Sequence, residues 1–320
     1  HRTHKPGVGG SNPPLATISL YSIMNLSIII VSYNSEKLLN KIIKKIPKEN
    51  EIIIIENSLN VDVKKDFEKK YNNTKVIIPA KNLGYASAFN LGFKKSKNNY
   101  VLSLTPDVII NSNLINQIIK IIKSFKNFTL IAPEYKNQKI YKNYIHAEEK
   151  RIKEKNISKF KLQEVKDIDW CFCVINKLKF KDKNILDENY FLYFETMDLC
   201  RHLFSKRHKM YVIKGLKFDH LGTSSSDNKF NNAIMLNRNW HFSWSKFYYF
   251  KKNNNYFYAL KKISPNIYQG INYVNTFGDN IDMSVVEKNK KLFQGTELMG
   301  KTIGIIGFGN IGKMVAKSCK

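Results

Sequence analysis

Cysteine is scarce in this sequence. The only cysteines among its 320 residues are Cys171, Cys173, Cys200 and Cys319. No two of them have the C-x-x-C spacing that is typical of structural zinc sites and redox centres, so neither kind of site is expected. We interpret the four side chains as free thiols of a cytosolic protein.

Long apolar runs are also absent from the sequence. The longest, such as residues 28–31 and 52–55, have the length of a strand and not the ~18 residues of a membrane-spanning helix. No transmembrane segment is therefore predicted. A signal peptide is not predicted either, because no apolar core of adequate length precedes a small-residue cleavage site.

Acidic residues are few compared with basic ones. The chain has 26 Asp and Glu against 53 Lys and Arg, which gives a formal net charge of +27. Such a surface attracts anions. Most of the excess is Lys scattered beside Asn and Ile, all of which have AT-rich codons, so a biased genome accounts for part of it. We expect phosphate-bearing partners and no nucleic acid.

Residues 1–23 are rich in Gly, Pro and Ser and have no helical or strand periodicity. They are predicted to be a disordered leader. The stretch HKPGVGGSNPPLAT resembles the end of a transfer-RNA gene read as protein, and Met24 directly precedes the first convincing strand. We therefore expect the native protein to begin at Met24.

From Met24 onward, strand-like and helix-like segments alternate. Strands are predicted at 26–33, 51–55, 75–79 and 100–104, with helices after Ser35 and near 62–71 and 85–96. This alternation predicts an α/β fold with a parallel sheet covered by helices. Ligands of such sheets bind beyond the carboxyl ends of the strands. The residues at those ends are Tyr33, Asn34, Glu56, Asn57, Asn82 to Gly84, and Asp107.

Six motifs in order carry a family resemblance. They are SIIIVSYNS, IIENS, NLGYASAFNLGF, LSLTPDV, LDENYFLYFETMDLCRHL and HLGTSSS. Their order and spacing resemble the inverting family-2 glycosyltransferases, particularly the rhamnosyltransferase-like branch, over about residues 24–263. The resemblance implies a GT-A type fold, a mixed, mostly parallel sheet flanked by helices. It also implies metal-dependent transfer of a sugar from a nucleoside-diphosphate sugar to a saccharide or lipid-linked saccharide, in synthesis of cell-surface polysaccharide such as lipopolysaccharide.

The resemblance assigns the donor and the metal to the strand ends. Donor-binding residues would be Tyr33, Asn34, Glu56, Asn57, Asn82, Gly84 and Asp107. Asn82-Leu83-Gly84 precedes a helix whose first amides can face a phosphate. The same residues are also typical of an ordinary loop followed by a helix cap. The family has Asn-Pro-Asp or Asp-x-Asp where this chain has Thr105-Pro106-Asp107, so only Asp107 matches.

A divalent ion, Mg²⁺ or Mn²⁺, often keeps one or two protein carboxylates beside the phosphates, so one Asp can suffice. His220 matches a histidine that helps to hold the metal in relatives; a structural histidine is the alternative.

Glu195 and Asp198 lie three residues apart at the predicted start of a helix. Acids there can simply complement the helix dipole. The family usually has E-D-x-D-L at this point, with a carboxylate that deprotonates the acceptor, but the middle acid is Thr196 here. We take Glu195 and Asp198 as the catalytic candidates and favour Glu195 as the base, because a threonine cannot accept a proton near neutral pH.

Residues 238–262 interleave aromatic and basic side chains. The segment could lie on an anionic bilayer with its aromatics at headgroup level, or it could pack on the protein's own core. Relatives act on lipid-carried acceptors, which favours a cytoplasmic protein in peripheral contact with the inner face of the plasma membrane.

Residues 264–320 resemble an incomplete piece of the NAD-binding domain of D-3-phosphoglycerate and other 2-hydroxyacid dehydrogenases. Gly307, Gly309 and Gly312 form the dinucleotide fingerprint between a strand and a helix. The sequence stops before the acidic ribose ligand expected ~20 residues later. We therefore expect the motif to be silent and NAD not to bind, as in a joined or truncated reading frame.

Two other functions stay open at this stage. The tail alone would suggest an NAD-dependent dehydrogenase. A non-catalytic sugar-nucleotide-binding module is the other alternative, because Thr105 and Thr196 replace residues usual in the family.

Overall fold

The computed structural model describes residues 24–137, 143–147, 154–157, 160–221 and 231–265, the last range with side chains from residue 238. The predicted leader and nearly all of the dehydrogenase-like tail lie outside these residues.

The strands are β1 (Ser27–Ser32), β2 (Glu51–Glu56), β3 (Thr74–Ile77), β4 (Tyr100–Leu104), β5 (Val108–Ile109), β6 (Leu130–Tyr135), β7 (Tyr144–His146), β8 (Glu154–Ile157), β9 (Phe160–Ile168), β10 (Phe172–Asn176) and β11 (Met210–His220). The helices are α1 (Glu36–Ile43), α2 (Val61–Lys70), α3 (Gly84–Lys95), α4 (Ser112–Ser124), α5 (Glu195–Ser205) and α6 (Asn231–Asn253), followed by helical residues 256–265.

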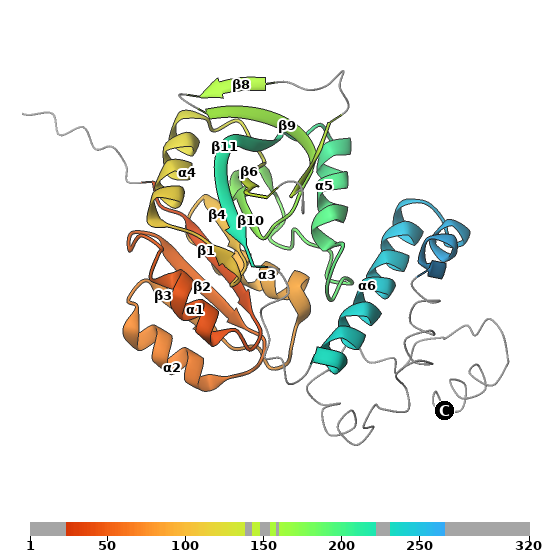
Figure 1. Ribbon diagram of the computed structural model, residues 1–320, viewed down its shortest axis with the longest axis horizontal. Coiled ribbons are helices and arrows are strands. Elements are labelled where there is room, and N and C mark those ends of the chain that lie inside the picture. Colours follow the sequence, from red (N-terminus) through yellow and green to blue (C-terminus); the bar gives the residue numbers. More distant parts are fainter. Residues whose placement is uncertain (1–23, 138–142, 148–153, 158–159, 222–230, 266–320) are drawn as a thin grey trace, which may run out of the picture.

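The strands form one mixed sheet with the order β3-β2-β1-β4-β10-β6-β11-β9-β7 (Figure 1). The pairs β3-β2, β2-β1 and β1-β4 are parallel, as the alternating sequence predicts. Beyond β4 most pairings are antiparallel, including both pairings of β10. Among the described residues no α-helix lies between β6 and β10, so they show no helical crossover of the kind that joins parallel neighbours. The expected mixed sheet flanked by helices is confirmed.

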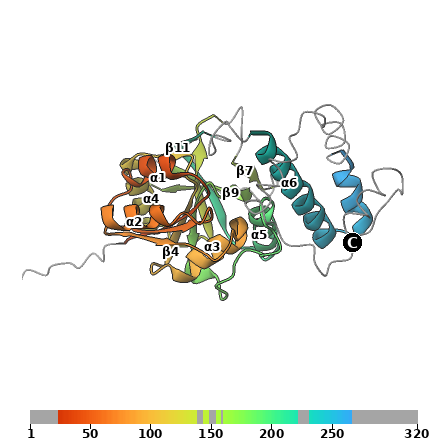
Figure 2. The same ribbon diagram turned by 90° about the horizontal axis from the view of Figure 1, so that it is seen from below.

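Helices cover both faces of the sheet because successive strand residues point to opposite sides. Ile28 and Ile30 of β1 pack in one core cluster with apolar residues of α1, α2 and α4. Ile29, between them, packs in a second cluster with residues of α3 and α5. Helix α6 lies beyond α5, at the end of the molecule away from α1 and α2 (Figure 1 and Figure 2). None of the described helices combines the length and apolar composition needed to cross a membrane.

Candidate active site

The residues after β1, β2 and β4 meet at one edge of the sheet, because these strands are parallel neighbours. Glu56 ends β2 with 1% of its surface exposed and accepts hydrogen bonds from the Ser32 hydroxyl and from the backbone amide and hydroxyl of Ser58. Tyr33 lies near it, since burial and then the charge of Glu56 raise the pKa of the phenol. Asn34 has a left-handed φ of 50°. The structure thus brings together these residues, which are predicted to bind the nucleotide-sugar donor.

Asn57 connects the end of β2 to the start of α3. Its amide donates to the Gly84 carbonyl at 3.0 Å and accepts from the Leu83 amide at 3.3 Å. The Asn82 side chain accepts from the Gly84 amide at 3.0 Å, and the Tyr85 amide donates to the Phe191 carbonyl at 2.7 Å. The first amides of α3 were expected to be able to face a phosphate. Two of them, those of Gly84 and Tyr85, instead donate hydrogen bonds to protein groups.

Gly84 is required by its surroundings. Its φ is +70°, a conformation that residues with a Cβ rarely adopt, and an added Cβ would lie 2.2 Å from the Phe191 carbonyl oxygen. The start of α3, which is predicted to bind the sugar donor, is therefore in direct contact with the loop that precedes α5.

Asp107 and His220 form the second part of the site. Asp107 follows β4, and β5 pairs with the end of β11, where His220 lies opposite Val108. The His220 Nε2 is 3.1 Å from the Asp107 Oδ2. Burial favours a raised pKa for Asp107, but the hydrogen bond and charge of His220 outweigh it and lower the pKa. The same hydrogen bond raises the pKa of His220 against the effect of burial.

This pair can be tested as a ligand set for a divalent ion. A carboxylate oxygen and an imidazole nitrogen already within 3.1 Å of each other both suit Mn²⁺, and the carboxylate suits Mg²⁺. No group of three or more His, Cys, Asp or Glu capable of holding a metal occurs among the described residues. The residues therefore fit an ion that takes its other ligands from a diphosphate and water, and they do not fit an all-protein cage.

Glu195 is the first residue of α5 and is 7% exposed. Its Oε2 is buried and has no hydrogen-bond partner among the described residues. Burial, and then the charge of Asp169, raises the pKa of Glu195 to about 7. The two preceding residues, Tyr193 and Phe194, have left-handed φ values of 71° and 66°. Strained backbone of this kind clusters at functional sites.

Asp169 is a site residue that the sequence analysis missed. It is partly buried, its Oδ1 accepts from the Cys171 amide at 2.8 Å, and burial raises its pKa. Its charge acts on Glu195 and also on Asp107 and His220, so it links the two parts of the site. An acid inside the apolar run DIDWCFCVI was the signal that could have identified it.

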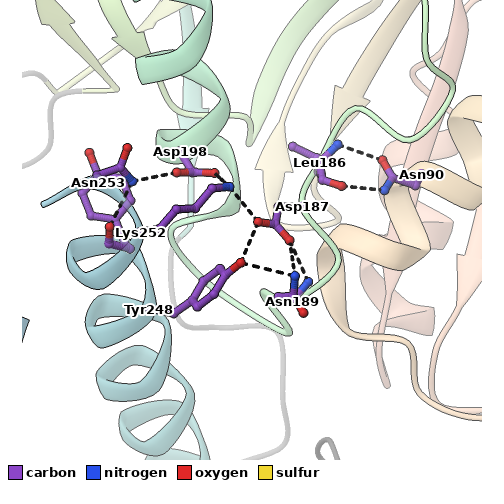
Figure 3. Close-up of polar contacts among 9 residues, drawn as sticks. Asn90, Leu186, Asp187, Asn189, Asp198, Tyr248, Lys252 and Asn253 are labelled. Atoms are coloured by element: carbon purple, nitrogen blue, oxygen red, sulfur yellow. Dashed lines mark hydrogen bonds and ion pairs between the residues drawn. The ribbon is translucent and has the colours of Figure 1, made fainter. Parts of the chain in front are cut away.

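Asp198, the other catalytic candidate, is engaged by α6 (Figure 3). Lys252 lies 2.6 Å from the Asp198 carboxylate and 2.7 Å from that of Asp187, and the Asn253 amide donates to Asp198 at 2.9 Å. The Tyr248 hydroxyl also donates to Asp187, at 3.1 Å. Asp198 therefore contributes to a contact between α5, α6 and the 184–194 loop.

Asn90 holds the same loop from the other side. Its amide donates to the Leu186 carbonyl at 2.8 Å and accepts from the Leu186 amide (Figure 3). It also accepts from the Ile185 amide. A cavity of about 440 Å³ lies nearby, lined by residues of this loop, α5 and α6, including Asp187, Asp198 and Lys252. Its lining includes neither Asp107 nor Glu195, so we do not assign the donor site to it.

One face of α6 packs on the loop before Glu195. The His241 ring stacks on Phe191 with centroids 4.3 Å apart, and the Ser245 hydroxyl donates to the Leu192 carbonyl at 2.7 Å. For this face, packing on the protein's own core is the correct interpretation of the two that the sequence left open. Gly307, Gly309 and Gly312 lie outside the described residues.

The fold and this site define a class of protein. Residues 27–182 match the family model described as glycosyl transferase family 2. Over these residues the chain is similar to the family-2 glycosyltransferases. Residues 270–320 match a second model, the NAD binding domain of D-isomer specific 2-hydroxyacid dehydrogenases, which agrees with the tail's predicted resemblance.

Three known proteins are similar to this chain in sequence or in fold. The low-salt glycan biosynthesis hexosyltransferase Agl10 of Haloferax volcanii is 25% identical over 192 residues, which are 55% of this chain and 60% of the relative. The mannosyltransferase PcManGT of Pyrobaculum calidifontis, solved with GDP-Man and Mn²⁺, aligns with a TM-score of 0.51 and 8% identity over 87% of this chain and 81% of that one. GalNAc-T7, solved with UDP, GalNAc and Mn²⁺, aligns with a TM-score of 0.48 and 12% identity over 77% of this chain and 58% of that one.

The match thus spans about three fifths of the curated relative's length. The likeness to PcManGT concerns the fold, which is of the GT-A kind.

Proposed function

We propose that this protein transfers a sugar from a nucleoside-diphosphate donor to a hydroxyl of a saccharide or lipid-linked saccharide, with inversion at the anomeric carbon. The observation that carries the proposal is the set of Asp107, His220 and a buried Glu195, whose Oε2 has no hydrogen-bond partner among the described residues, beyond the strand ends where donors bind in such sheets. Mn²⁺ in the PcManGT structure supports a divalent ion here. The motifs favour a rhamnosyltransferase-like enzyme of surface polysaccharide synthesis.

The donor would lie along the residues after β1, β2 and β4. Tyr33, Asn34, Glu56 and Asn57 would contact its nucleoside part, and Asn82 and Gly84 would shape that surface through the contacts described above. A divalent ion held by Asp107 and His220 would neutralise the charge of the diphosphate.

Glu195 would act as the general base. The acceptor oxygen bonds to the anomeric carbon, the bond from that carbon to the diphosphate oxygen breaks, and the hydroxyl proton passes to the Glu195 carboxylate. A pKa of about 7 suits this step, because catalytic bases work best when their pKa lies near the operating pH. Asp198 is the weaker candidate, since Lys252 and Asn253 already engage its carboxylate.

The proposal is tested by screening nucleoside-diphosphate sugars for protection against thermal unfolding, with and without Mn²⁺. A ligand present far above its Kd raises the stability of the folded state, so one donor should raise Tm in a metal-dependent way. Protection without any release of nucleoside diphosphate in the presence of acceptors would instead favour the non-catalytic binding module.

The family-model match at residues 270–320 favours NAD binding as a second candidate. We expect none from residues 264–320, which contain the glycine turn for a pyrophosphate but no acidic residue ~20 positions after it to hold the ribose. Saturable enhancement of NADH fluorescence at micromolar concentrations would contradict this expectation. We place the protein in the cytoplasm, in peripheral contact with the inner face of the plasma membrane.

A further inference from the structure

An exposed row of aromatic side chains lies on a different face of α6 from the one that contacts the 184–194 loop. Trp240, Trp244 and Phe247 are spaced at i, i+4 and i+7, which places them on one side of the helix. Trp240 is 60% exposed and Trp244 is 49% exposed. His241 and Ser245, on the adjoining face, contact the loop and are buried.

The row continues into the helical residues 256–265. The Trp244 and Phe247 ring centroids are 6.1 Å apart, those of Phe247 and Tyr256 are 5.6 Å apart, and those of Tyr256 and Phe257 are 5.9 Å apart. Phe257 is 81% exposed, more than any other large hydrophobic residue in the described part of the chain. We call Trp240, Trp244, Phe247, Tyr256 and Phe257 the aromatic ridge.

Cations surround the ridge. Residues 238–265 contain Arg238, Lys246, Lys251, Lys252, Lys261 and Lys262 and no Asp or Glu. Lys252 forms ion pairs with Asp187 and Asp198, whereas Lys251 and Lys261 are exposed to solvent. Exposed Trp and Tyr among lysines on a helix is the pattern of a segment that lies in the interface of an anionic bilayer.

We propose that the aromatic ridge is a docking surface for an anionic lipid bilayer. This inference rests on the proposed function, because the other face of α6 contacts the loop that leads to Glu195. A bilayer on the ridge would hold that loop close to acceptors carried in lipid. The ridge therefore gives the glycosyltransferase access to a lipid-linked saccharide.

The positive charge around the aromatic ridge argues against two other occupants, a second copy of the chain and the chain's own C-terminal residues. A second copy docked through the same surface would bring the two sets of lysines together, because a two-fold interface is formed by the same patch on both chains. The chain's own residues 266–320 carry 7 Lys against 4 Asp and Glu, so they also lack complementary charge. An anionic bilayer complements both the cations and the aromatic rings.

The test is co-sedimentation of the full chain with phosphatidylcholine vesicles that contain or lack phosphatidylglycerol. We expect binding only to the anionic vesicles, with loss at high salt as the charges are screened. Trp244→Ala with Phe257→Ala should weaken binding on the order of tenfold, through lost apolar contact. Lys251→Glu with Lys261→Glu should weaken it by at least about 25-fold, from about fivefold for each charge lost.

Matched controls lie on other surfaces. Leu178 is a 67% exposed apolar residue outside the ridge, and Lys64 is an exposed lysine of α2. Leu178→Ala and Lys64→Glu should bind vesicles like the parent. The inference is overturned if the parent binds neither vesicle or both equally, or if the ridge variants bind like the parent. It is also overturned if those variants change the molecular mass in solution, which would identify the ridge as a contact between copies.

Transfer to a water-soluble saccharide, measured without vesicles, separates this inference from the proposed function. The ridge variants should retain the parental rate there, because none of the altered residues contacts the donor site or Glu195. Loss of vesicle binding with intact soluble transfer is the expected result. A parent that binds anionic vesicles but transfers no sugar would contradict the proposed function and leave the docking surface standing.

Discussion

Replacing Glu195 by Gln should remove turnover and at the same time stabilise the protein at alkaline pH. The carboxyl is buried, its Oε2 lacks a hydrogen-bond partner among the described residues, and its pKa is raised from 4.5 to about 7. Burial that raises an acid's pKa disfavours the ionised form in the folded state. The charged Glu195 therefore destabilises the fold, and Gln keeps the shape without the charge.

The magnitude follows from the two pKa values. An acid whose pKa is raised on folding gives its full stabilisation below its unfolded pKa of 4.5 and loses it as pH rises through about 7. At 1.36 kcal/mol for each pKa unit, the cost of ionisation is about 1 kcal/mol at pH 5 and about 3 kcal/mol at pH 8. Glu195→Gln should therefore gain roughly 2 kcal/mol more relative to the parent at pH 8 than at pH 5.

The assay is urea unfolding of both proteins at the two pH values, combined with initial rates. Loss of a general base typically costs ~10²–10⁴-fold in rate, and donor binding should stay nearly unchanged. The parental rate should fall tenfold per pH unit below about 7, because the base must be ionised. A pH-independent difference in stability, or parental turnover in Glu195→Gln with none in Asp198→Asn, would refute the reasoning.

Three further predictions test other parts of the site. Asp107→Ala should weaken Mn²⁺-dependent donor binding more than about tenfold by loss of an oxygen ligand, and unchanged affinity in Mn²⁺ by calorimetry would be inconsistent with it. Gly84→Ala should lower the free energy of unfolding by at least about 2 kcal/mol, because its Cβ would meet the Phe191 carbonyl at positive φ; parental stability in urea would count against the described contact. Lys252→Met should cost about 1 kcal/mol through the loss of its two ion pairs, and the exposed neighbour Lys251→Met should cost nothing measurable in the same experiment.

The parallel half of the fold was predictable because its residues follow regular patterns. Predicted and observed strand ends agree to within a few residues for β1, β2 and β4, because apolar runs mark the strands and helical spacing marks the segments between them. The antiparallel half was not predicted. Among the described residues, its strands from β6 to β10 are separated by no α-helix, so nothing in the local periodicity fixes which strands pair.

The candidate site was predictable where a motif follows a strand. Asp107 and His220, more than 100 residues apart in the sequence, meet as expected from the resemblance. Asp169 was missed because a single partly buried acid follows no spacing rule and becomes recognisable only when folding brings it near Glu195. The role of Asp198 depends on Lys252, a partner 54 residues away that no local pattern connects to it.

Thr196 is the position where this chain departs most from the family pattern. It directly follows Glu195, and it cannot serve as a base near neutral pH. If Glu195 is the base, Thr196→Asp should leave the rate of transfer equal to the parent or raise it. A dead Thr196→Asp enzyme of parental stability would indicate that this position does not face the acceptor.

The most direct test of the central claim is product analysis with the donor that the thermal screen identifies. The full chain is incubated with that donor, Mn²⁺ and a saccharide acceptor, and nucleoside diphosphate and the anomeric configuration of the product are measured together by NMR. The proposed function predicts one equivalent of nucleoside diphosphate for each new glycosidic bond, inverted configuration, and loss of both signals in Glu195→Gln. Retained configuration, or equal product from Glu195→Gln, would contradict it.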